Sequence, residues 1–169
     1  MQPAAIITEN ANATSAVGEA LGRLARPGDV LLLSGDLGAG KTRLVKGLAA
    51  GLGVREPVTS PTFNILLVHT GRLPLYHVDL YRLERADQLE DIDYFGTLEA
   101  GGITAVEWGD RFAEAAPDDY LHMTFHIVSD DERRIELAAF GERGSALLAR
   151  LRAECADAQG VRFEPGDAR

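Results

Sequence analysis

The sequence predicts a mixed α/β fold, and three observations lead to this prediction. The apolar run 30–33 is typical of a buried parallel strand. A glycine-rich segment at 35–42 follows it, and leucine and alanine then recur at helical spacing from Arg43 to Leu52. Further along the chain, two pairs of β-rich segments each enclose a turn, which indicates antiparallel hairpins. With 169 residues, of which 46% are hydrophobic, the chain fits one packed domain, and we treat 1–169 as a single domain.

The N-terminal elements are a strand and a helix. Residues 4–8 form an apolar segment that predicts the first strand. From Asn12 to Leu24, apolar residues repeat at helical spacing after asparagine and threonine residues that suit a helix cap. A turn signal, Pro27-Gly28-Asp29, then leads into the apolar strand.

The segment 35–42 reads Gly-Asp-Leu-Gly-Ala-Gly-Lys-Thr and satisfies the pattern G-x-x-x-x-G-K-[ST] of a phosphate-binding loop. Its glycines allow backbone N–H groups to approach phosphate oxygens in conformations that a Cβ would block. Lys41 can reach the β- and γ-phosphates, and the Thr42 hydroxyl can bind Mg²⁺ at the helix N-terminus, which favours anions. The motif therefore predicts binding of a nucleoside triphosphate, in preference to a glycine-rich turn with a solvated lysine.

A loop and a hairpin follow the predicted helix. Residues 56–62 hold two prolines and three hydroxyl side chains, so they form either a loop with a hydrogen-bonding role or an ordinary connector. The segments 63–69 and 73–81 flank Thr70-Gly71-Arg72, which predicts a hairpin. Pro74 fits only at the edge or the end of a sheet, so it marks the start of the second strand.

Alternation along this second strand places Asp79 on the same face as His77 and Tyr81. Asp79 is then an acidic residue within an apolar strand, and it needs either solvent or a cation.

The next elements bring a carboxylate to the end of another strand. The acidic segment 85–95 predicts a short helix that ends on an aromatic anchor, and the apolar run 103–106 predicts a strand. Glu107 and Trp108 follow this strand directly. Because ligands of open parallel sheets bind beyond the carboxyl ends of the strands, Glu107 is placed to meet a nucleotide metal ion. A solvated strand end is the alternative.

The C-terminal part predicts a second hairpin and a helix. The segments 120–128 and 133–140 flank a polar turn, and alanine and leucine recur at helical spacing over 145–156. We expect residues from about 157 to 169 to form a mobile tail.

Charge and composition limit the kinds of partner that this chain is expected to bind. The net charge is −9, and residues 84–169 alone carry −11. Such a surface repels a phosphate backbone, so we expect no direct, sequence-independent binding of nucleic acid outside a local basic patch. No apolar stretch approaches the roughly 20 residues of a membrane span, and the N-terminus lacks a signal pattern, so we expect a cytoplasmic protein without a membrane partner. The single cysteine, Cys155, is predicted to pack in the terminal helix.

Five segments carry a resemblance to a known family: GDLGAGKT at 35–42, SPTF at 60–63, HVDLYRL at 77–83, DYF at 93–95 and VEW at 106–108. In this order they resemble the TsaE (YjeE) family, bacterial ATPases needed for threonylcarbamoylation of the adenosine next to the tRNA anticodon. The resemblance covers about residues 10–140. The first segment alone indicates only a phosphate-binding loop, whereas the ordered set is specific to the family.

The resemblance implies a P-loop NTPase-like three-layer α/β domain with a central, mostly parallel sheet plus antiparallel hairpins. It implies that Thr42 and Glu107 bind Mg²⁺. Lys41 and Asp79 are the expected catalytic residues, and Asp79 would position the attacking water. The expected nucleotide contacts are Thr14, Leu37, Gly38, Ala39, Gly40, Lys41, Thr42, Ser60, Thr62 and Trp108.

The resemblance also implies cofactors and partners. ATP and Mg²⁺ are the expected cofactors, TsaD and TsaB are the expected partner proteins, and contact with tRNA is expected to be indirect. Two other functions are open on the residues alone. A small-molecule kinase would carry an arginine-rich lid, which the sequence does not suggest. A nucleotide-dependent binding switch of the GTPase kind would carry an Asn-Lys-x-Asp segment for guanine, which the sequence lacks.

Overall fold

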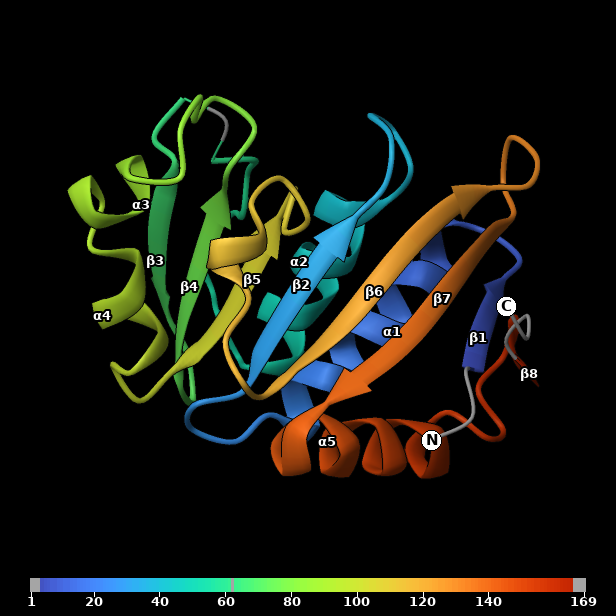
Figure 1. Ribbon diagram of the computed structural model, residues 1–169. Coiled ribbons are helices and arrows are strands. Elements are labelled where there is room, and N and C mark those ends of the chain that lie inside the picture. Colours follow the sequence, from blue (N-terminus) through green and yellow to red (C-terminus); the bar gives the residue numbers. More distant parts are fainter. Residues whose placement is uncertain (1–3, 62, 166–169) are drawn as a thin grey trace.

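The computed structural model describes residues 4–61 and 63–165. Its centre is an eight-stranded sheet with the strand order β3-β4-β5-β2-β6-β7-β1-β8 (Figure 1). Four neighbouring strands in the middle run parallel to one another: β4 (Pro74–Asp79), β5 (Ile103–Glu107), β2 (Val30–Ser34) and β6 (Tyr120–Ile127). The carboxyl ends of these strands therefore meet at one edge of the sheet.

Antiparallel strands extend the sheet on both sides. β3 (Leu66–Thr70) pairs with β4 and forms the first predicted hairpin. On the other side, β7 (Arg133–Phe140) pairs with β6 and forms the second hairpin, and β1 (Ala4–Thr8) pairs with β7. The last strand, β8 (Val161–Pro165), pairs with the free side of β1. The predicted α/β class, with parallel central strands and antiparallel hairpins, is thus confirmed.

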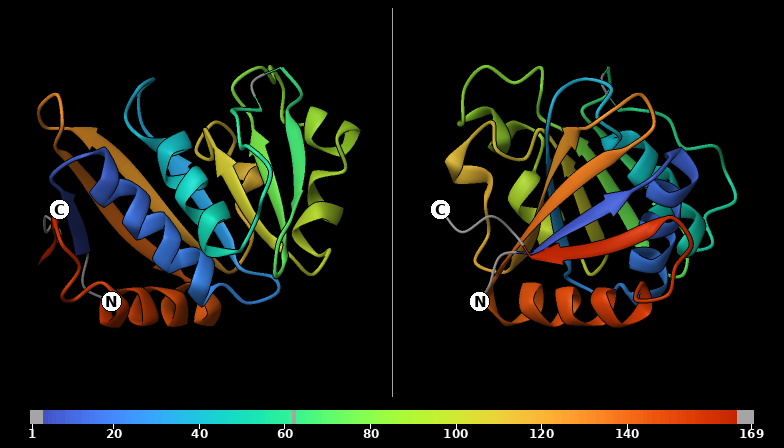
Figure 2. Two further views of the ribbon diagram at one scale, coloured as in Figure 1. Left: turned by 180° about the vertical axis from the view of Figure 1, so that it is seen from behind. Right: turned by 90° about the vertical axis from the view of Figure 1, so that its right-hand side faces the viewer.

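Two helices cover one face of the sheet. α1 (Ala11–Leu24) and α2 (Lys41–Gly51) lie side by side behind the sheet in Figure 1 and in front of it in the left view of Figure 2. Their backbones approach closely, because a Cβ added at Gly18 of α1 would lie 2.1 Å from the carbonyl oxygen of Leu44 in α2. Only glycine permits this approach. α1 thereby fixes the position of α2, whose first turn carries Lys41 and Thr42.

Shorter helices cover the opposite face. α3 (Gln88–Asp91), α4 (Tyr94–Leu98) and the 3-10 helix Ala113–Ala115 lie there, and the buried Tyr94 hydroxyl donates a hydrogen bond to the Ala115 carbonyl oxygen at 2.8 Å. α5 (Gly141–Glu154) lies across the end of the sheet near β6 and β7 (Figure 1). No helix within the described ranges is long and apolar enough to cross a membrane.

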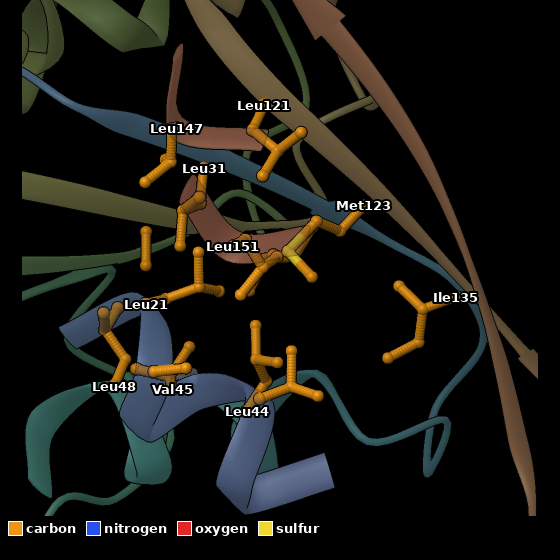
Figure 3. Close-up of a cluster of buried hydrophobic side chains, with 14 of the residues drawn as sticks. Leu21, Leu31, Leu44, Val45, Leu48, Leu121, Met123, Ile135, Leu147 and Leu151 are labelled. Atoms are coloured by element: carbon orange, nitrogen blue, oxygen red, sulfur yellow. The ribbon is translucent and has the colours of Figure 1, made fainter. Parts of the chain in front are cut away.

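The apolar residues of β2 belong to two hydrophobic cores, one on each face of the sheet. Leu31 and Leu33 belong to the core on the side of α1 and α2, with Leu44, Leu48 and residues of β6 and α5. Figure 3 shows Leu31, Leu44 and Leu48 in this cluster. Val30 and Leu32 point the other way and belong to a second cluster under α3 and α4. Burial on both faces explains why this strand is continuously apolar rather than alternating.

Two predicted helices differ from the sequence predictions. The helix predicted over 85–95 is two short helices, because Asp93 adopts a left-handed conformation (φ 52°) between α3 and α4. The terminal helix begins at Gly141 rather than Ser145, and the Asp119 side chain accepts a hydrogen bond from the Arg143 N–H in its first turn.

The expectation of a mobile tail from about 157 to 169 is wrong for residues 161–165. These residues form β8, and Val161 and Phe163 pack against the main core. Pairing with β1 also satisfies backbone groups that would otherwise form a free sheet edge. Residues 166–169 lie outside the described part of the chain.

Candidate functional site

A cavity of about 300 Å³ opens where β2, β4 and β5 end. Its walls come from the phosphate-binding loop, the start of α2, the 54–61 loop and the ends of β4 and β5. The lining residues are Leu37, Gly38, Ala39, Gly40, Lys41, Thr42, Arg43, Lys46, Ser60, Asp79, Glu107 and Trp108. Among the described residues, the fold brings together all the predicted site residues except Thr14.

The phosphate-binding loop joins β2 directly to α2. Gly40 is the N-cap residue of α2, with φ 109°, and it provides no side-chain cap for the helix. The first N–H groups of a helix have no intrahelical acceptor, so those of α2 are available to an anion in the cavity. Gly38 adopts φ 78°, and a Cβ there would meet no heavy atom within 4 Å. The loop backbone is therefore open to a phosphate group.

Lys41 is buried at the centre of this loop. Its Nζ donates hydrogen bonds to the carbonyl oxygens of Gly35 and of Asp36, the second at 3.4 Å. It also lies 3.9 Å from the centroid of the Trp108 ring, within the range of a cation–π contact. Burial lowers the pKa of Lys41, and the nearby Glu107 and Asp79 carboxylates oppose this effect. The loop carbonyl oxygens thus hold the ammonium group, and the nearby carboxylates favour its charged form.

Thr42, Glu107 and His77 form a chain of hydrogen bonds across three elements. The Thr42 hydroxyl donates to Glu107 Oε1 at 2.8 Å, and Glu107 Oε2 lies 2.5 Å from His77 Nε2. Glu107 is the last residue of β5 and is 3% exposed, and His77 in β4 is fully buried. Both oxygens of the Glu107 carboxylate are therefore fixed.

Asp79 ends β4 beside Glu107, its partner in the parallel register. It is buried, and its Oδ1 accepts a hydrogen bond from the Tyr81 N–H at 2.9 Å, which orients the carboxylate. Because Asp79 lines the same cavity as the phosphate-binding loop, it is placed to contact a polyphosphate bound there.

Thr14 does not line the main cavity. It lies in α1 beside a neighbouring cavity of about 200 Å³, which shares Gly38, Gly40 and Arg43 with the main one. Its hydroxyl is buried and lies 2.8 Å from the Thr8 hydroxyl. The predicted contact Thr62 lies outside the described residues.

Arg133 was not predicted from the sequence. At the start of β7, its guanidinium donates to the carbonyl oxygens of Ala39 at 3.1 Å and Gly38 at 3.3 Å. It also donates to the Ser129 carbonyl oxygen at 2.8 Å, in the turn of the β6–β7 hairpin. Arg133 therefore ties that hairpin to the phosphate-binding loop across 95 residues of sequence, and no local pattern signals such a contact.

His122 is a second unpredicted neighbour of the loop. Its Nε2 lies 2.8 Å from the hydroxyl of Ser34, the last residue of β2. Burial lowers the pKa of His122, and Asp110 opposes the shift. The pair fixes the end of β2 where the loop begins.

The donor set fits Mg²⁺ together with phosphate. Two ligands at right angles on Mg²⁺, with bonds of about 2.1 Å, lie about 3 Å apart. Thr42 Oγ1 and Glu107 Oε1 are 2.8 Å apart, so they suit adjacent ligand positions. Residues 4–61 and 63–165 hold no group of three or more His, Cys, Asp or Glu residues that could bind a metal ion. A metal here needs phosphate and water as further ligands, which is usual for Mg²⁺.

A larger cavity, of about 760 Å³, lies between the turn before β2, α4 and the segment before β6. It contains none of the predicted site residues. We place the candidate site in the smaller cavity, because convergent cationic, hydroxyl and carboxylate groups indicate a binding site better than volume does.

The fold and the site define an α/β protein with a phosphate-binding-loop sequence between a central parallel strand and a helix. The family model "Threonylcarbamoyl adenosine biosynthesis protein TsaE" matches residues 8–135. The chain belongs to the TsaE family.

Individual proteins agree with this assignment. The tRNA threonylcarbamoyladenosine biosynthesis protein TsaE of Treponema pallidum is 41% identical over 132 residues, which are 78% of this chain and 98% of that protein. The protein of the same name from Bacillus subtilis is 42% identical over 145 residues, or 85% of this chain and 90% of that protein. The crystal structure of Bacillus subtilis YdiB is similar with a TM-score of 0.76 and 36% identity, covering 90% of this chain and 96% of that one.

Proposed function

We propose that this chain binds ATP with Mg²⁺ in the 300 Å³ cavity and hydrolyses it in the service of tRNA threonylcarbamoyladenosine biosynthesis. Membership of the TsaE family supports the place in that biosynthesis. The observation that carries the ATPase proposal is the convergence of Lys41, Thr42, Asp79 and Glu107 on one cavity beside an open helix N-terminus.

Each group has a task that follows from its position. The N–H groups at the start of α2 would bind the phosphates, and Lys41 would move from its loop carbonyl oxygens to the β- and γ-phosphates. Thr42 and Glu107 would hold Mg²⁺, which supplies charge neutralisation for the phosphates when it is bound. Asp79 would accept a hydrogen bond from the attacking water and orient it for in-line attack on the γ-phosphate.

The partners are part of the proposal. TsaD and TsaB would dock on this chain and accelerate its turnover, and ATP hydrolysis would reset the assembly between rounds of tRNA modification. The charge of −11 on residues 84–169 suits docking to protein better than to tRNA, so contact with tRNA would be indirect. This role belongs in the cytoplasm, where tRNAs are used.

Phosphate release tests this proposal. ATP is supplied to the chain alone, and to the chain with the TsaB and TsaD proteins of its own organism, and inorganic phosphate is measured. We expect slow release alone and acceleration by the pair. Lys41→Ala should abolish release and should fail to support tRNA modification in cells that lack the wild-type chain.

Three results would contradict the proposal. Tight ATP binding without phosphate release in any mixture would favour the binding-switch alternative. Transfer of the γ-phosphate to a small molecule, instead of its release, would favour the kinase alternative. Normal tRNA modification with Lys41→Ala would show that ATP hydrolysis by this chain is not needed for the modification.

A further inference from the structure

We propose that His77 is a positioning residue, which holds the Glu107 carboxylate in the orientation that a metal ion needs. The inference rests on the proposed function, because it concerns Mg²⁺ in the same cavity. His77 does not line that cavity, and its ring is fully buried in β4 behind Glu107. It would act only through Glu107.

The geometry assigns one partner to each oxygen of Glu107. Oε1 accepts from the Thr42 hydroxyl at 2.8 Å, and Oε2 lies 2.5 Å from His77 Nε2. The His77 contact fixes the rotation of the carboxylate, and Oε1 is then held toward Thr42 and the cavity. Without His77, the carboxylate keeps a single partner and can turn about its terminal bond.

The hydrogen bond also fixes the proton on the histidine ring. A carboxylate only accepts hydrogen bonds, so His77 Nε2 must carry the proton that it donates to Oε2. The other ring nitrogen, Nδ1, is buried and has no hydrogen-bond partner among the described residues. A buried polar atom without a partner destabilises a core, so packing alone does not account for a histidine at this position. The hydrogen bond to Glu107 accounts for a histidine at this position.

Two amide substitutions separate positioning from packing. Glutamine places its side-chain nitrogen near the position of histidine Nε2, whereas the shorter asparagine places it near Nδ1. His77→Gln should therefore keep the hydrogen bond to Glu107, and His77→Asn should lose it. Both variants are polar and carry no ionisable group, so protonation does not enter the comparison.

Isothermal titration with ADP, at several Mg²⁺ concentrations and in EDTA, measures the effect without ATP turnover. Loss of a group that orients a metal ligand weakens metal binding by about 10- to 100-fold, so His77→Asn should raise the half-saturating Mg²⁺ concentration by at least about tenfold. His77→Gln should stay close to wild type. The affinity for ADP in EDTA should be the same in all three proteins.

Steady-state kinetics of ATP hydrolysis with and without TsaB and TsaD gives a second readout. Excess Mg²⁺ should restore most of the activity of His77→Asn, because a disoriented ligand can still bind the metal. A structural role would predict the opposite pattern: a lower melting temperature and weaker ADP binding that Mg²⁺ does not correct.

Nuclear magnetic resonance of the ¹⁵N-histidine-labelled wild-type chain tests the contact without nucleotide or metal. We expect a slowly exchanging proton on His77 Nε2, assigned by its loss in His77→Gln. A proton on Nδ1 alone would overturn the inference. So would wild-type Mg²⁺ dependence in a folded His77→Asn, or equal impairment of both variants. If the wild type binds no nucleotide, the proposed function fails, and the resonance still decides the contact.

Discussion

Gly18→Ala would test how the packing of α1 on α2 positions the phosphate-binding loop. An added Cβ at Gly18 would lie 2.1 Å from the Leu44 carbonyl oxygen and 2.8 Å from the Leu48 nitrogen, both in the backbone of α2. Backbone atoms cannot rotate away as a side chain can. The two helices must therefore separate by about 1 Å to restore ordinary contact distances.

Two opposing terms determine the change in stability. Overpacking of this kind costs up to about 3 kcal/mol, and alanine is better than glycine in a helix by about 1 kcal/mol. The net loss is about 2 kcal/mol, which lowers the melting temperature of a chain of this size by about 4–8 °C. Calorimetry and urea titration would measure it. Asn12→Ala, at an exposed position of the same helix, is the control and should change the melting temperature little.

The substitution should also weaken nucleotide binding. Lys41 and Thr42 are the first two residues of α2, so they shift when the helix shifts. A displacement near 1 Å at the reacting groups can lower an enzyme's rate about 100-fold, so ATP hydrolysis should slow as well. An unchanged melting temperature in Gly18→Ala would refute the close backbone packing described above. A lower melting temperature with unchanged ADP affinity would refute its link to the loop.

Three further predictions concern other side chains. The chain has one tryptophan, and Lys41 Nζ lies 3.9 Å from the Trp108 ring centroid, so ADP binding should change tryptophan fluorescence, and Lys41→Ala should remove the change. Burial lowers the pKa of His122, so the folded chain binds that proton less tightly than the unfolded chain. Stability should therefore fall as pH drops below about 6.5, and urea titrations from pH 7.5 to 5.5 should show a smaller fall in His122→Gln. Burial raises the pKa of the Cys155 thiol, so a thiol reagent such as DTNB should react with it only after unfolding; rapid reaction in the native chain would contradict its burial.

Local patterns were sufficient where a feature depends on neighbouring residues. The phosphate-binding loop needs a strand, glycines and a helix in sequence, so 30–52 could be predicted in detail. The position of Glu107 followed from the rule that ligands bind at the carboxyl ends of parallel strands. The structure brings Glu107 to the loop as that rule predicts.

Features that depend on register or on distant packing could not be predicted. The contact between His77 and Glu107 exists because β4 and β5 pair in parallel with His77 opposite Ala105. Register is set by the whole sheet, so alternation within β4 identified the face of His77 and not its partner. Arg133 reaches the loop because β6 and β7 pass beside it, which the hairpin pattern alone does not reveal. The position of Thr14 beside the neighbouring cavity depends on how α1 packs against the rest of the fold, which its own sequence does not indicate.

The pairing of β8 with β1 has a consequence for handling this protein. Every residue of β1 is buried, and residues 161–165 pair with its outer backbone groups. A chain shortened at Gly160 would expose five consecutive residues, Ala-Ala-Ile-Ile-Thr, as a flat apolar edge. Such an edge recruits strands from other molecules, so shortened chains should aggregate on concentration even when their nucleotide site is intact. The C-terminal strand thus prevents self-association by covering this edge, in addition to forming part of the sheet.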